Sequence, residues 1–390
     1  MNRRKLCSRT HRATAVGAGF GLILLTWIVA GCQDMGCNRP AATPSPVSTP
    51  TAVPRPEKRV EQQGPVQPRR VSFSPRDPSR LLVMQSNGVA GVWQVAEPKN
   101  PTKVLEIITP ALDVDFAADG MSIFTAGRDG SVRRWSAEGK ETWRAEISPK
   151  TAVRTIGVSP DGSVVAAGGD DGKVHILTVR GVELGSVDTG QEMVLSLNFS
   201  AQSLRLACDG SDTRIRIFRR IGAAPGIELE RIFREPNERY AKMLPNLIRL
   251  DVQWGWEEST VFAPDGTQVL TANLDGTCEF WTIDGKRRHH PFSNHGDHHI
   301  RAVAFSPLGN LVASGGFDGK AQLWTTSGTP AGHPLTAHND VVTSIAFSPD
   351  GKVIATAGMD GTVRFWNPQG ERLGMLPRGR VPLQPRTKSK

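Results

Sequence analysis

The sequence repeats one strand-and-turn unit seven times. In the clearest copy, residues 335–376, four apolar runs at 342–347, 353–357, 362–366 and 372–376 predict four short strands. Ser-Pro-Asp-Gly, Met-Asp-Gly and Asn-Pro-Gln-Gly stand between the runs and predict turns. A lone sheet of this size cannot bury both of its faces, so each copy needs other copies as neighbours.

The copies agree at fixed offsets from an acidic or amide residue in the tight turn. These seven marks are Asn87, Asp129, Asp171, Asp212, Asp275, Asp318 and Asp360, at intervals of 42, 42, 41, 63, 43 and 42 residues. Six places after each mark stands a large apolar residue: Trp93, Trp135, Leu177, Phe218, Trp281, Trp324 or Trp366. Thirteen or fourteen places before each mark stands Phe73, Phe116, Val158, Phe199, Phe262, Phe305 or Phe347. A strand-only repeat of about 44 residues indicates a radial array of sheets.

This pattern resembles the WD-repeat β-propeller family over residues 68–376. The resemblance implies an all-β fold, a single seven-bladed β-propeller of four-stranded blades. In that family a His before the first strand, a hydroxyl residue in the second strand, the turn Asp and the third-strand Trp form a hydrogen-bonded ladder. Only the last copy has all four in register: His338, Thr356, Asp360 and Trp366. The sixth copy has Ser314, Asp318 and Trp324, with His295 displaced by one residue.

The other copies depart further from the ladder. The second and fifth copies keep the hydroxyl, the Asp and the Trp but have no His. In the third and fourth copies Ala167 and Cys208 replace the hydroxyl residue, and Leu177 and Phe218 replace the Trp. We expect those two blades to rely on apolar packing instead of buried polar networks.

The residue before each turn mark should face the narrow top of the propeller, where partners of this family commonly dock. Apolar residues stand there in blades five to seven, with two more nearby in the loops that enter blades six and seven, and they suggest a contact patch for an unidentified protein partner. The patch consists of Leu274, Phe317 and Met359, with Val341 and His299. The alternative is that these side chains tuck into the central channel or against the next loop.

Residues 1–31 have the form of an export signal, with five Arg or Lys and no acid before an apolar run. The run ends in Ile-Val-Ala-Gly-Cys, which resembles the lipobox of bacterial lipoproteins and implies lipidation at Cys32. The alternative is an uncleaved transmembrane anchor. Gln33 after the Cys favours the periplasmic side of the outer membrane, with inner-membrane anchoring as the alternative.

Three further segments flank or interrupt the repeats. Residues 32–67 are rich in Pro and predict a disordered tether. The long interval marks an insertion of about 21 residues within 219–254, and residues 377–390 form a basic tail. The chain carries a net charge of +9, but the signal and the tail each contribute five cations and no acid, so residues 32–376 carry −1. This charge does not indicate a nucleic-acid-binding domain.

Catalytic motifs do not stand out. The sequence contains no Gly-rich phosphate loop, nucleophile elbow or paired carboxylates at a telling spacing, and the inner strands show no convergent acidic set. The His-rich stretch with His289, His290, His295, His298 and His299 is a weak candidate for Zn or Cu, because its spacing matches no closed site. We therefore predict a monomeric, non-enzymatic interaction scaffold without a cofactor. The alternative function is a ligand-binding or catalytic centre in the channel or the His-rich loop.

Overall fold

The computed structural model describes residues 66–212, 214–221, 226–233, 260–273, 275–296, 298–336 and 338–377. The chain divides into two units, Met1–Arg59 and Val60–Lys390, and every described residue belongs to the second. All regular elements among these residues are β-strands, which confirms the all-β prediction. The described part of the chain contains no helix with the length and apolar character needed to cross a bilayer.

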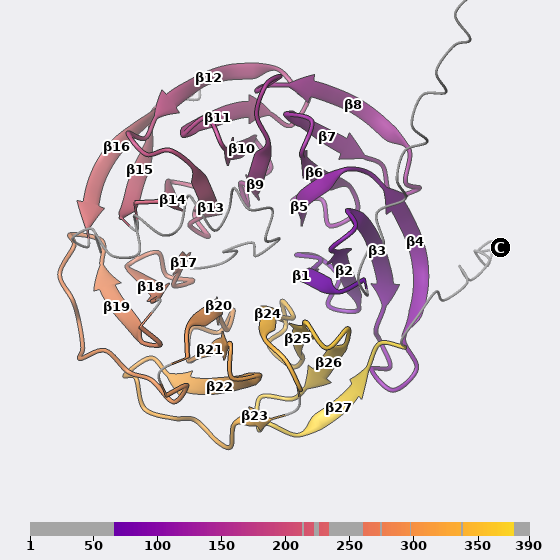
Figure 1. Ribbon diagram of the computed structural model, residues 1–390, viewed down its shortest axis with the longest axis vertical. Coiled ribbons are helices and arrows are strands. Elements are labelled where there is room, and N and C mark those ends of the chain that lie inside the picture. The colour runs from indigo at the N-terminus through magenta and orange to yellow at the C-terminus, as the bar shows by residue number, and fades with distance from the viewer. Residues whose placement is uncertain are drawn as a thin grey trace, which may run out of the picture. The chain divides into compact units, whose positions relative to one another are not determined.

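Seven antiparallel sheets stand in a ring, so the seven-bladed propeller is confirmed (Figure 1). Inner strands such as β1, β5 and β24 lie near the centre of the ring, and outer strands such as β4, β8 and β12 lie on its circumference. The strands of blades one to four are β1 (Pro68–Phe73), β2 (Arg80–Gln85), β3 (Val89–Gln94), β4 (Thr102–Ile108); β5 (Ala111–Phe116), β6 (Ile123–Gly127), β7 (Ser131–Trp135), β8 (Glu141–Glu146); β9 (Val153–Val158), β10 (Val164–Gly169), β11 (Lys173–Thr178), β12 (Glu183–Asp188); and β13 (Val194–Phe199), β14 (Arg205–Gly210), β15 (Ile215–Ile221), β16 (Gly226–Phe233). Those of blades five to seven are β17 (Thr260–Phe262), β18 (Gln268–Ala272), β19 (Cys278–Thr282); β20 (Ile300–Phe305), β21 (Leu311–Gly316), β22 (Lys320–Thr325), β23 (Leu335–Thr336); and β24 (Val342–Phe347), β25 (Ile354–Gly358), β26 (Val363–Trp366), β27 (Arg372–Met375).

The fifth blade forms its outer strand in a looser way than the others. Its continuous sheet contains β17, β18 and β19. Single bridges from Cys278 to Phe292 and from Trp281 to Arg287 occupy the place of the fourth strand. Blade six is similar, because a bridge from Trp324 to Pro330 precedes its two-residue β23.

The hydrophobic core lies between the blades. Seven clusters of buried residues each join adjacent blades, and each contains one of the large apolar residues that stand six places after the turn marks. The second strand of a blade is covered on both faces, so β10 (VVAAGG) is buried throughout. The large apolar residue six places after each turn mark therefore lies at the contact between neighbouring sheets.

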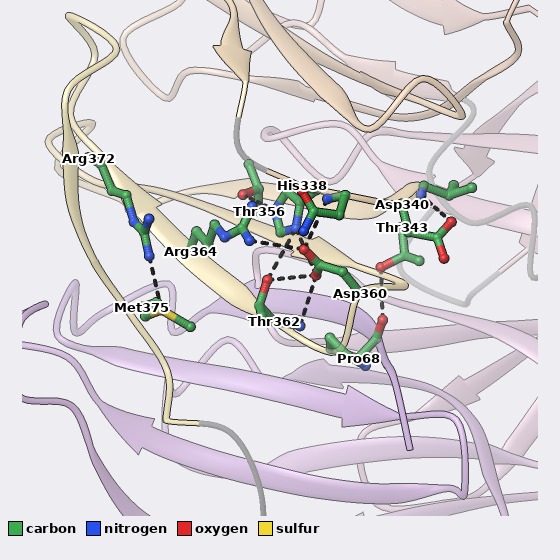
Figure 2. Close-up of polar contacts among 12 residues, drawn as sticks. Pro68, His338, Asp340, Thr343, Thr356, Asp360, Thr362, Arg364, Arg372 and Met375 are labelled. Atoms are coloured by element: carbon green, nitrogen blue, oxygen red, sulfur yellow. Dashed lines mark hydrogen bonds and ion pairs between the residues drawn. The ribbon is translucent and has the colours of Figure 1, made fainter. Parts of the chain in front are cut away.

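The ring closes by packing between blades one and seven. Blade seven already has four strands of its own, and one apolar cluster joins Phe73 and Trp93 of blade one to Phe365 and Leu376. Two side chains of β24 add hydrogen bonds across this seam. Thr343 Oγ1 donates to the Pro68 carbonyl at 2.9 Å (Figure 2), and Ser344 Oγ accepts the Val71 N–H at 3.2 Å.

The structure describes the first part of the segment that holds the predicted insertion. Residues 219–221 belong to β15 and residues 226–233 form β16, so the outer strand of the fourth blade lies within the 219–254 segment. A paired outer strand satisfies backbone groups that a loop would leave to solvent. The remainder, residues 234–259, lies outside the described residues.

Candidate protein-binding rim and its structural ladder

The ladder of blade seven links four side chains: Thr356 of β25, Trp366 of β26, Asp360 of the turn between these strands and His338 of the loop before β24. Figure 2 shows His338, Thr356 and Asp360. His338 Nδ1 lies 3.1 Å from Asp360 Oδ1, and His338 Nε2 lies 2.8 Å from Thr356 Oγ1. The Trp366 indole N–H donates to the same Thr356 oxygen at 3.0 Å. The indole can only donate, so one proton arrangement satisfies the set: Trp366 donates to Thr356, Thr356 donates to His338 Nε2, and His338 Nδ1–H donates to Asp360.

This arrangement requires a neutral imidazole beside an ionised carboxylate. Burial lowers the pKa of His338, and Asp360 opposes this only in part. Burial would raise the pKa of Asp360, but hydrogen bonds from Thr362 and His338 outweigh it and lower that pKa to about 2. The ladder is therefore in its bonded form at neutral pH.

Stability should fall on mild acidification because of His338. Its folded-state pKa lies below the ordinary value of 6.5, so the unfolded chain takes up the proton first as the pH falls through 6.5. The folded state is thereby disfavoured. Denaturant unfolding between pH 8 and pH 5 should show this loss, and His338→Gln should flatten the pH profile. An unchanged profile in His338→Gln would contradict the assignment.

Blade six forms the complete ladder as well, although His295 stands one residue further from its turn Asp than His338 does. His295 is buried, with Nδ1 2.9 Å from Asp318 Oδ1 and Nε2 2.8 Å from Ser314 Oγ. The Trp324 indole donates to Ser314 Oγ at 2.9 Å. The loop after His295 accommodates the extra residue, with Gly296 at a φ of +60°, a conformation that favours glycine.

The expectation of purely apolar packing in blades three and four was wrong. In blade three His175 is buried between two carboxylates, with Nε2 2.8 Å from Asp171 and Nδ1 2.7 Å from Glu183. In blade four the buried Arg216 pairs with Asp212 at 2.6 Å. In both blades the partner of the turn carboxylate is therefore a residue of the third strand, His175 or Arg216.

The third-strand partner has a fixed place in the repeat, which is visible in the sequence. It stands four places after the turn mark, where Arg133, Arg216 and Arg364 pair with Asp129, Asp212 and Asp360. His175 occupies the same position in blade three. In blades two and five the Trp-to-Thr bond also persists, at 3.0 Å for Trp135 and 3.3 Å for Trp281.

Two of the predicted rim residues are partly exposed on adjacent blades. Phe317 and Met359 each donate their backbone N–H to the preceding loop, to the His299 and Val341 carbonyls respectively, at 2.9 Å. The His299 ring meets Phe317 edge-on, with ring centroids 5.5 Å apart. Val341 is buried at 5% exposure, so its side chain does not belong to an exposed patch, which corrects the prediction. Leu274 lies outside the described residues, as does Cys32.

The His-rich stretch does not converge on a metal-binding group. Both nitrogens of His295 are occupied by the ladder, and His289 packs edge-on against Phe280. His290 and His298 are exposed. Across the described ranges no cluster of three or more His, Cys, Asp or Glu could hold a metal ion.

Charged side chains do converge on the inner strands, although no convergent acidic set was predicted there. Arg70 of β1 contacts Asp113 of β5 at 3.1 Å, and Asp113 also accepts the Ile156 N–H of β9 at 2.8 Å. Asp115 accepts a hydrogen bond from Ser72. Burial raises the pKa of both aspartates, and Arg70 opposes this. These residues join three successive blades across their inner strands.

The ring of seven antiparallel sheets defines the class as a seven-bladed β-propeller, and its His–hydroxyl–Asp–Trp ladder is similar to that of WD-repeat propellers. Four segments match the family model described as "WD domain, G-beta repeat", at residues 107–136, 143–177, 286–325 and 329–367. These matches fall on blades two, three, six and seven.

Curated relatives match parts of the chain. A 219-residue stretch, 55% of the chain, is 26% identical to Periodic tryptophan protein 2 of Arabidopsis thaliana and covers 22% of it. A 230-residue stretch, also 55%, is 38% identical to the Periodic tryptophan protein 2 homolog of Dictyostelium discoideum and covers 23% of it. A 107-residue stretch, 27% of the chain, is 28% identical to Transcription factor unc-37 of Caenorhabditis elegans and covers 17% of it. The matches thus span less than a quarter of each relative's length.

Proposed function

We propose that this chain is a non-enzymatic interaction scaffold that binds a protein partner at its rim. The observation that carries the proposal is the pair Phe317 and Met359, two large apolar side chains that remain partly exposed in equivalent turns of adjacent blades. Both blades have complete ladders, and both turns are fixed by backbone bonds to the preceding loops. A rigid apolar pair of this kind is typical of an interface anchor.

Changing both rim residues to Asp should abolish capture of the partner and leave the fold intact. An unpaired carboxylate at the centre of an apolar contact is costly to desolvate, and neither residue belongs to an inter-blade cluster. Cross-linking from cells followed by mass spectrometry should show a set of proteins that is lost only from the double variant Phe317→Asp, Met359→Asp.

The matched control changes equivalent turn positions on other blades, Ser86→Asp with Arg128→Asp. This control should retain the partner set because those positions are already polar. Retention of the same proteins by the Phe317, Met359 double variant would contradict the rim as the binding surface.

The proposal also places the scaffold in a bacterial cell envelope, held by a lipid on Cys32. The support is the sequence alone: the export signal, the small-residue lipobox and the Pro-rich tether in residues 1–67. The periplasmic side of the outer membrane is our first choice. The relatives named above are eukaryotic and do not bear on this part.

Replacing Cys32 by Ser should move the protein from the membrane fraction to the soluble fraction, since the thiol that would carry the lipid is lost. Fractionation with immunodetection measures this, and Cys37→Ser in the tether is the matched control. Full membrane retention of the Cys32→Ser protein would instead support an uncleaved anchor.

A further inference from the structure

The outer strand of blade five carries a cationic run. Lys286, Arg287 and Arg288 are the only three consecutive Lys or Arg residues within residues 32–376, and His289 and His290 follow them. The sequence contains no acid from residue 285 to residue 296. The run stands out because residues 32–376 as a whole carry a charge of −1.

The fold does not require these charges. Blade six follows the same path after its third strand, with a bridge from Trp324 to Pro330 where blade five has the bridge from Trp281 to Arg287. At the equivalent positions blade six has Thr329 for Lys286 and Ala331 for Arg288. Since blade six forms the same edge with uncharged residues at these two positions, Lys286 and Arg288 need an explanation other than folding.

Two side chains of the run turn back onto the blade. Arg287 lies over the Trp281 ring, 5.4 Å from its centroid, and pairs with the buried Glu279 at 3.1 Å. His289 packs edge-on against Phe280. Lys286, Arg288 and His290 are exposed, and the Lys286 side chain is 82% exposed. Cations two residues apart therefore face outward on the circumference.

A cleft of about 450 Å³ adjoins the run where blade four meets blade five. Blade four lines it with Arg231 and with the ion pair between Arg205 and Glu230, and blade five lines it with residues that include Thr282 and Asp284. Arg231 is exposed, so it extends the cationic surface beyond Lys286. Asp284 contacts Lys286 at 3.0 Å, but a pair this exposed contributes little and is readily exchanged for another carboxylate.

We propose that this surface, Lys286, Arg288, His290 and Arg231, binds an extended acidic segment of a partner protein with carboxylates two residues apart. Alternate side chains of an extended chain lie about 6.6 Å apart on one side, which is also the spacing expected between Lys286 and Arg288 in an extended edge. The ordered spacing favours a peptide over a fluid lipid surface. The site lies outside the Phe317 and Met359 rim and does not depend on it.

The test uses a fluorescent heptapeptide of alternating Ser and Glu, and a peptide of the same composition with its three Glu contiguous. We expect the full-length protein to bind the alternating peptide more tightly by anisotropy, with an affinity that falls as salt rises. The variant Lys286→Thr, Arg288→Ala, which installs the blade-six residues, should weaken binding about fivefold or more. The control Lys99→Ser, Lys140→Ser removes the same charge from exposed positions on other blades and should bind normally.

A reciprocal variant tests the proposal by gain of function. Thr329→Lys with Ala331→Arg places the cations on the matching edge of blade six and should add a second peptide site. Equal binding of both peptides, equal loss in the control, or binding to phosphatidylglycerol vesicles without binding to the peptide would each overturn the proposal.

Discussion

Replacing Asp113 by Ala should lower the free energy of unfolding by about 3–5 kcal/mol, because a buried ion pair loses one partner. Asp113 is fully buried, contacts Arg70 at 3.1 Å and accepts the Ile156 N–H at 2.8 Å. The substitution removes the acceptor of the Ile156 N–H and a carboxylate partner of the buried Arg70 guanidinium at the same time. Urea unfolding followed by tryptophan fluorescence measures the change.

The control for this prediction removes both charges. Arg70→Met with Asp113→Leu should recover much of the loss, since a buried ion pair replaced by apolar residues is often neutral in stability. Asp113→Ala alone must be the more damaging change. A double variant as unstable as Asp113→Ala would show that the Ile156 bond, and not the ion pair, holds this part of the ring.

Thr356→Val should destabilise the protein by about 2–4 kcal/mol, because one hydroxyl serves two buried neighbours and each group left unsatisfied costs about 1–3 kcal/mol. Val has nearly the same shape, so the change isolates the hydrogen bonds to His338 and Trp366. Urea unfolding measures the loss.

The matched control is Thr336→Val, an exposed strand position in blade six, where the change should be close to neutral. A small effect of Thr356→Val, equal to that of Thr336→Val, would mean that the ladder of blade seven orders the site without stabilising the fold.

Periodicity predicts most of this fold, because the same two apolar positions recur in every copy. Trp366 and Phe347 could be assigned to the core from spacing alone, and both pack between blades six and seven. The ladder of blade seven was predicted from the resemblance to the WD-repeat family, not from spacing. The same resemblance gave Ser314, Asp318 and Trp324 in blade six with His295 displaced by one residue, and the structure shows that the displaced His295 still reaches Ser314.

Contacts between copies were harder to predict than contacts within them. Arg70 and Asp113 stand 43 residues apart at the same register of adjacent inner strands, so their pairing becomes visible only when the copies are laid side by side. For Val341 the prediction of exposure was wrong. Val341 stands in the loop before blade seven, but its carbonyl accepts the Met359 N–H and its side chain is buried.

The seam between blades one and seven gives the ring a mechanical weak point. The described chain reaches the propeller at β1, whose first residue, Pro68, is the residue that Thr343 of blade seven holds. Strand ladders join strands only within a blade, and at this seam, unlike the other six junctions, the chain does not run on from one blade to the next. A pulling force applied through the N-terminal side of the chain would therefore act first on β1 and its contacts with β24. We expect blades one and seven to separate at this seam while the strands within each blade stay paired.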